Sequence, residues 1–297
     1  MDMTVSPSTL EDLRREIDVV DDGLLDLLIR RNRLSQEVGR LKGGTGGFRP
    51  AREMQVLRRL LARREAPLDP VVLVRLWREI IGASLAQQRS HTIAVVASGD
   101  DRDGDLGLLA REHFGVLATV QEHSSSVRVL HALAAGEALL GLVRPPQPEV
   151  ADPWWRYLAR RGEPRPQVVA RLPILPPSTP YSTARAAAYV VASSPVEPSG
   201  RDRSLLIAET GADFSRSAMR NLMAKVDLPC AELLLHQDGH ERWLYLAEVD
   251  GFIAPDDERL AALEKLEREK LYQTWLVGSY AVPFSEADLM AGRTGAR

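Results

Sequence analysis

The sequence predicts a multidomain protein: an all-α unit of three helices, then a small α/β unit, then an α+β unit. Apolar residues recur every three or four positions from residue 8 to residue 89, which is typical of amphipathic helices. Strand-like and helix-like segments alternate from residue 92, and after residue 203 they follow the order β-α-β-β-α-β. We therefore expect domains over 1–90, 91–198 and 199–285, followed by a disordered tail over 286–297.

The composition is that of an ordinary globular protein, with 44% hydrophobic and 27% charged residues among 297. A net charge of −3, from 38 basic and 41 acidic side chains, indicates neither a nucleic acid nor an anionic membrane as partner. No apolar run reaches the roughly 18 residues of a membrane span, and the acidic N-terminus has no apolar signal region. The single cysteine, Cys230, excludes an internal disulfide and favours a reducing compartment. We expect a cytoplasmic protein.

The first helix is expected to be unusually long. It begins at the capping-box pair Ser8 and Glu11 and continues for roughly 32 residues, or about 48 Å. A rod of that length needs a partner helix along its apolar face. The glycine-rich stretch 43–47 ends it, because glycine costs roughly 1 kcal/mol in a helix interior. Pro50 suits the first turn of a second helix, and a third is expected over about 70–89.

The rest of the chain changes character at residue 91. TIAVVA reads as a buried strand and LGLLAREHFG as a helix, and PQVVARLPI and AAAYVVAS as later strands, which together predict a small parallel or mixed α/β layer. The C-terminal segments are SLLIAE, SRSAMRNLMAKV, CAELLLHQ, RWLYLAEVDG, DDERLAALEKLEREK and QTWLVGSYAVP. Their β-α-β-β-α-β order is typical of a ferredoxin-like unit.

Three cations on or just after the first helix are candidates for binding an anion. Arg14 and Arg31 are 17 residues apart, about 25 Å along the axis, so one small ligand cannot contact both on the same helix. If both serve one ligand, they come from two copies of the chain. Arg31 and Lys42 are about 16 Å apart near one face, so their long side chains can converge on one substrate.

Four polar residues on the second and third helices complete the candidate set. Arg52 and Glu53 stand at the start of the second helix, and Ser84 and Gln88 share a face of the third at i, i+4 spacing. Each alone is more typical of a solvated surface or of helix packing. Together, several cations and one amide suit a small, multiply anionic ligand.

The segments LEDLRREIDVVDDGLLDLLIRRNRLSQEVGRLK, RPARE and LWREIIGASLAQQ closely resemble the all-helical class of chorismate mutase over about residues 8–90. The resemblance implies an intertwined homodimer with shared active sites. It implies that each site takes Arg14 from the neighbouring protomer and, from its own chain, the residues Arg31, Lys42, Arg52, Glu53, Ser84 and Gln88. Some members carry an aspartate in the bend where this chain has Arg49, so the contact to the substrate hydroxyl is expected to depend more on Glu53.

The activity that this resemblance implies is the Claisen rearrangement of chorismate to prephenate in phenylalanine and tyrosine biosynthesis. The step is pericyclic and needs no nucleophile, metal or cofactor. Arg14 and Arg31 would hold the two carboxylates, and Lys42 and Gln88 would donate to the ether oxygen as it gains negative charge. Glu53 would accept from the hydroxyl.

The order of the three units resembles the bifunctional chorismate mutase–prephenate dehydratase, which ends in an ACT-type regulatory domain. The α/β unit has only about 100 residues, SGDDRDGD replaces the Gly-Thr-x-Ser loop, and Ala187, Ala188 and Tyr189 stand at the Thr-Arg-Phe motif. We expect an inactive dehydratase-like remnant and an ACT-like unit open to an amino-acid effector or a docking enzyme. The alternatives are a bifunctional enzyme with substitute residues and a non-catalytic regulatory or scaffold protein.

Overall fold

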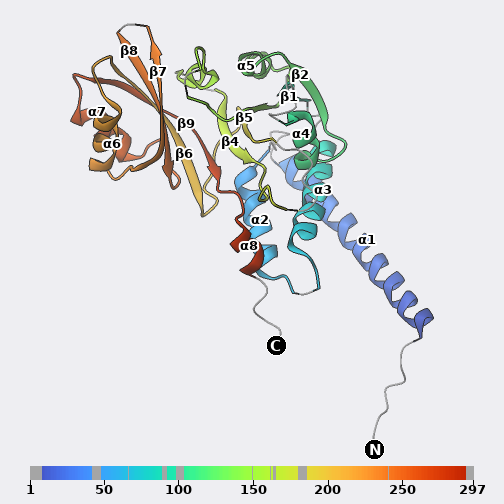
Figure 1. Ribbon diagram of the computed structural model, residues 1–297. Helices are drawn as coiled ribbons and strands as arrows, with labels where there is room; N and C mark the ends of the chain where they lie inside the picture. Colours follow the sequence, from blue (N-terminus) through green and yellow to red (C-terminus); the bar gives the residue numbers. More distant parts are fainter. Residues whose placement is uncertain are drawn as a thin grey trace, which may run out of the picture.

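The computed structural model describes residues 9–41, 48–65, 67–88, 92–97, 104–148, 150–160, 162, 165–179, 186–239 and 241–291. Its N-terminal helices are those expected: α1 (Leu10–Leu41), α2 (Pro50–Ala62) and α3 (Pro70–Gln88). The pair that caps α1 is Thr9 and Asp12, which bond to each other reciprocally, instead of the predicted Ser8 and Glu11, and Ser8 lies outside the described residues. The long α1 projects away from the rest of the molecule as a rod (Figure 1). Pro50 begins α2 at its first turn, and Lys42 and the glycine-rich stretch lie outside the described residues. Within the described part, no helix is both long enough and apolar enough to span a membrane.

The described strands form one nine-stranded mixed sheet in the order β2-β1-β3-β5-β4-β9-β6-β8-β7. The strand β1 pairs in parallel with β2 and β3, β4 pairs in parallel with β9, and the other neighbours are antiparallel. Their bounds are β1 (Thr92–Val96), β2 (Thr119–His123), β3 (Leu140–Val143), β4 (Gln167–Leu172), β5 (Ala188–Ala192), β6 (Asp202–Gly211), β7 (Cys230–Asp238), β8 (Arg242–Asp250) and β9 (Leu271–Ala281). The accompanying helices are α4 (Leu106–Phe114), α5 (Ser126–Ala134), the 3-10 helix η2 (Trp154–Leu158), α6 (Arg216–Lys225), α7 (Glu258–Leu266) and α8 (Glu286–Met290).

The C-terminal half has the predicted β-α-β-β-α-β order, and its strands lie in the order β9-β6-β8-β7, all antiparallel. Numbered within the unit, this is the four-one-three-two arrangement of ferredoxin-like folds. Gly278 of β9 joins this half to β4, where it pairs with Val168. Its φ is +150°, and a Cβ there would lie 2.2 Å from the Val168 carbonyl oxygen, so this junction requires glycine.

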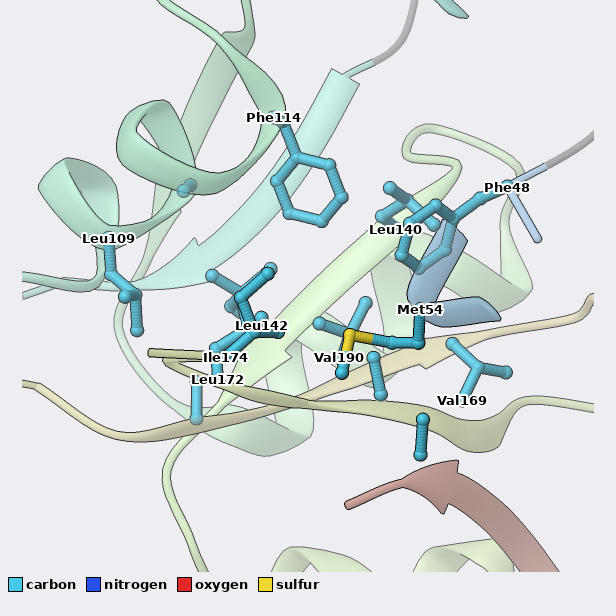
Figure 2. Packing of buried hydrophobic residues seen from close by; sticks show 14 of the residues in the cluster. Phe48, Met54, Leu109, Phe114, Leu140, Leu142, Val169, Leu172, Ile174 and Val190 are labelled. Carbon is cyan, nitrogen blue, oxygen red and sulfur yellow. The ribbon is translucent and has the colours of Figure 1, made fainter. Parts of the chain in front are cut away.

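The helices α2 and α3 do not form a core of their own, as an independent all-helical unit would. They share one hydrophobic core with α4 and with one face of β1, β3, β4 and β5. Phe48 and Met54 reach over the strands that carry Leu140 and Val190, and the ring of Phe114 points into the same core (Figure 2). The opposite face of this part of the sheet is covered by α5 and η2. In contrast, α1 has no buried residue and contacts α3.

The expectation of a disordered tail from residue 286 is wrong for residues 286–291. Ser285 and Asp288 form a reciprocal capping box at the start of α8, and Arg201 pairs with Asp288 at 2.6 Å. Leu289 is buried, and its carbonyl accepts from Arg64 of the N-terminal region. A short polar segment looks like a tail in sequence because these partners are about 90 and 220 residues away. Residues 292–297 lie outside the described part.

Gly82 sets how closely α3 approaches the end of α4. A Cβ on Gly82 would lie 2.3 Å from the Phe114 carbonyl oxygen, a backbone atom that cannot swing aside. We therefore expect Gly82→Ala to lower the free energy of unfolding by about 1 to 3 kcal/mol, although alanine is the better helix former. The matched control is Gly23→Ala on α1, where nothing lies within 4 Å and a gain of about 0.5 to 1 kcal/mol is expected. Urea unfolding checks both, and equal stabilisation of the two variants would contradict the packing described.

Candidate active site

Arg31 and Ser84 meet where α1 crosses α3. The Nη1 of Arg31 donates to Ser84 Oγ at 2.8 Å, and the same hydroxyl donates back to the Ile80 carbonyl at 2.8 Å. Ser84 is buried and Arg31 is about half-buried, which lowers the pKa of the Arg31 guanidinium from its usual value. A cation that has lost part of its water shell attracts a carboxylate more strongly than an exposed one. The structure thus unites two candidates that are 53 residues apart in sequence.

Glu53 lies in a buried ion pair that the sequence analysis did not foresee. Its Oε2 accepts from Nη1 of Arg78, and the two residues are 8% and 4% exposed. The other side of the Arg78 guanidinium reaches the end of α4, where Nε and Nη2 donate to the His113 carbonyl at 2.8 and 2.5 Å. One side chain therefore contacts a predicted site residue and the α/β region at once.

The position of Arg78 in the sequence could have indicated a buried charge. It follows Val74 by four residues and precedes Ile81 by three, so it occupies the apolar face of α3. A lone charge at such a position must be paired when the face is buried. The imidazole beside it stays neutral, because burial and then the positive charge of Arg78 hold the pKa of His113 well below its ordinary value. His113 is therefore not a second cation that competes for Glu53.

The remaining candidates lie apart from the Arg31–Ser84 contact or outside the described residues. Arg14 is exposed near the start of α1, beside Glu11 at 3.7 Å, and about 25 Å along the helix from Arg31. Arg52 is exposed and donates to Gln55 at 3.4 Å. Lys42 is not among the described residues, and neither is the side chain of Gln88 at the end of α3.

A cavity of about 190 Å³ lies between α3, the α4–β2 connection and the sheet. Its lining is mainly apolar, with Phe48, Ile93 and Leu140, and its one ionised side chain is the acidic Glu79. A carboxylate in an apolar wall repels a dianionic ligand, so this cavity does not suit one. Among the described residues, no group of His, Cys, Asp and Glu could hold a metal ion.

Tyr189 is enclosed rather than open to a cleft. Its hydroxyl donates to Oε2 of the buried Glu248 at 3.1 Å, and Tyr280 donates to Oε1 of the same carboxylate at 2.8 Å. Arg203 completes the group with a bond of 2.5 Å to Glu248. Burial first, and then Tyr280 and Glu248, raise the pKa of Tyr189 far above its ordinary value. The hydroxyl is therefore a still weaker acid than a free tyrosine.

Residues 13–89 match the family model described as chorismate mutase type II. The bifunctional chorismate mutase/prephenate dehydratase of Pseudomonas aeruginosa is 32% identical over 142 residues, which are 45% of this chain and 38% of that protein. The protein of the same description from Neisseria gonorrhoeae is 40% identical over 81 residues, or 27% of this chain and 22% of the relative. This chain therefore spans well under half the length of these curated relatives.

Among solved structures, the prephenate dehydratase of Arthrobacter aurescens in complex with L-Phe has a TM-score of 0.45 at 14% identity, covering 68% of this chain and 95% of that one. The enzyme of Streptococcus mutans has a TM-score of 0.42 at 12% identity, with 65% and 100% covered. The sequence matches, together with the helices and side chains described above, lead to one conclusion. The N-terminal helices carry a chorismate mutase type II domain, an isomerase domain, in a chain related to the bifunctional chorismate mutase/prephenate dehydratases.

Proposed function

We propose that this protein is a chorismate mutase, which rearranges chorismate to prephenate on the route to phenylalanine and tyrosine. The observation that carries the proposal is the contact of Arg31 with Ser84 across α1 and α3, inside a segment that matches the mutase family. It supplies a half-desolvated cation, backed by a buried hydroxyl, where a substrate carboxylate would bind.

The proposed mechanism relies on orientation and electrostatics. Arg31 and the partner's Arg14 bind the two carboxylates and hold the folded conformer in which the reacting carbons approach each other. Lys42 and Gln88 donate to the ether oxygen as its bond to the ring breaks, and each is expected to contribute about 3 kcal/mol. Arg52 adds positive charge, and Glu53 accepts from the ring hydroxyl. No cofactor or metal takes part in these steps.

The surface of α1 supports a homodimer with shared sites. Its apolar residues, among them Leu13, Ile17, Val20 and Leu24, are exposed along the rod. A contiguous apolar stripe of this length on a soluble helix marks an interaction surface. A second α1 packed antiparallel covers the stripe and places Arg14 of one chain near Arg31 of the other, which the 25 Å between them forbids within one chain.

We propose a mutase unit over 1–90, a shortened dehydratase-like unit over 91–198 that shares its core with α2 and α3, and an ACT-like unit over 199–285. The dehydratase-like unit is proposed to be inactive, because Ala187 and Ala188 have no group that could donate a proton or hold a carboxylate. The Tyr189 hydroxyl donates to Glu248, and its raised pKa makes it a poor acid. An amino-acid effector or docking enzyme that acts on this chain is expected at its C-terminal units.

Shared sites predict complementation between two inactive variants. Arg14→Ala and Arg31→Ala are each expected to abolish most turnover of chorismate. After mixing and exchange, about a quarter of wild-type activity should return, because half of the dimers are mixed and each has one intact site of two. Arg15→Ala, an exposed arginine next to Arg14, is the control and should keep full activity alone. A fully active monomer in sedimentation would contradict the dimer.

The donor at the ether oxygen predicts a pH dependence. The wild-type rate should be nearly constant between about pH 6 and 9, because an amide does not titrate and a lysine keeps its proton there. Gln88→Glu can donate only when its carboxyl is protonated, so its activity should fall about tenfold for each pH unit above the pKa of that carboxyl. Steady-state rates from pH 4 to 9 test this, with Gln87→Glu as the neighbouring control. Equal activity of Gln88→Glu at pH 5 and 8 would remove Gln88 from the mechanism.

The purified protein should make prephenate and stop there. Chromatography of the products from chorismate should show prephenate, with phenylpyruvate only at the spontaneous rate seen without enzyme. Tyr189→Phe and its partly buried control Tyr157→Phe should leave this outcome unchanged. Enzyme-dependent phenylpyruvate at neutral pH that is lost in Tyr189→Phe would show instead that the chain is bifunctional and that this hydroxyl supplies the proton.

A further inference from the structure

Arg78 is held in place by the α/β region. The last carbonyls of a helix have no partner inside it and carry partial negative charge, so a cation is favoured at that end. The His113 carbonyl at the end of α4 accepts two bonds from the Arg78 guanidinium. Four residues further along α3, Gly82 lets the two backbones approach closely enough for these bonds. The position of the guanidinium is thus set by α4 as well as by α3.

The carboxylate of Glu53 depends on that guanidinium. Glu53 lies on the buried side of α2, near Met54 and Leu57, where an ionised group without a partner would be strongly destabilised. Arg78 Nη1 donates to Oε2 of Glu53, and this bond fixes the Glu53 side chain. The other carboxylate oxygen, Oε1, is then the one that can accept from a ligand. Ser84 follows Arg78 by six residues, about 9 Å along α3, so one helix carries the support for both Glu53 and Arg31.

We infer that Arg78 is a positioning residue of the mutase site: it orients Glu53 toward the substrate hydroxyl and ties that orientation to α4 of the α/β region. The inference rests on the proposed mutase function and deepens it. It assigns to the α/β region a share in the mutase reaction, through a single side chain that contacts no substrate. Loss of Arg78 should therefore act through the hydroxyl contact, which is made in both the bound substrate and the transition state, and should raise KM more than it lowers kcat.

The experiment is a double-mutant cycle in the full chain, with chorismate as substrate. We expect Arg78→Met to lower kcat/KM by at least tenfold, mainly through KM, and Glu53→Gln to lower it to a similar degree. The double variant should be no worse than the poorer single one, because Arg78 then has no carboxylate to orient. Arg75→Met, one turn earlier on α3 and beside Glu112 of α4, is the matched control and should keep kcat/KM within about twofold.

Two further measurements separate positioning from a loss of fold. A chorismate analogue without the ring hydroxyl should react equally fast with wild type and Arg78→Met, because the contact that Arg78 supports is missing in both. If Arg78→Met does not fold by circular dichroism, Arg78→Lys carries the same tests, since an ammonium keeps the charge but lacks the fork that reaches Glu53 and His113 together. Losses that multiply in the double variant, or an equal loss with the analogue, would overturn the inference while the mutase function stands. A wild-type chain that does not turn over chorismate would refute the function, and the inference with it.

Discussion

The buried guanidinium of Arg78 fixes how α3 meets α4 within the core that the helical and α/β regions share. It joins Glu53 of α2 to the carbonyl end of α4, so three helices meet at one charge. Such a group is costly to bury, and it is tolerated because every face of the fork has an acceptor. Because Gly82 has no side chain, the backbones of α3 and the end of α4 can approach each other closely. Phe48 also packs against Phe114 at the end of α4, with ring centroids 5.3 Å apart.

The N-terminal helices differ in which of their apolar surfaces are buried. The faces of α2 and α3 that carry Met54, Leu57 and Val74 are buried against the sheet, so they are not available to a second chain. The apolar stripe of α1 remains exposed and is available. Burial of an apolar surface is favourable, and α2 and α3 bury theirs against the sheet, whereas the stripe of α1 is left for a second chain. The Arg31–Ser84 contact lies between them, where the buried α3 meets the exposed rod.

A second polar group supports the junction of the two halves of the sheet. Glu248 of β8 accepts from Tyr189 of β5, Tyr280 of β9 and Arg203 of β6, so strands from both halves share one carboxylate. Next to it, Gly278 and Val168 bring β9 and β4 into direct pairing. Tyr189 therefore links the two halves of the sheet through Glu248.

Local pattern was enough to predict the helices before α8, most strands and the C-terminal β-α-β-β-α-β order, because helical period, strand runs and caps depend on neighbours in sequence. The set of candidate site residues came from the resemblance to a family and stays a prediction. The same pattern could not show that α2 and α3 share a core with the sheet, since an apolar helix face looks alike whatever covers it. It missed Arg78, whose partners Glu53 and His113 are 25 and 35 residues away, and the folded segment 286–291, whose Arg201 lies 87 residues from Asp288. Contacts between such distant residues depend on the packing of whole elements, and only the tertiary structure decided them.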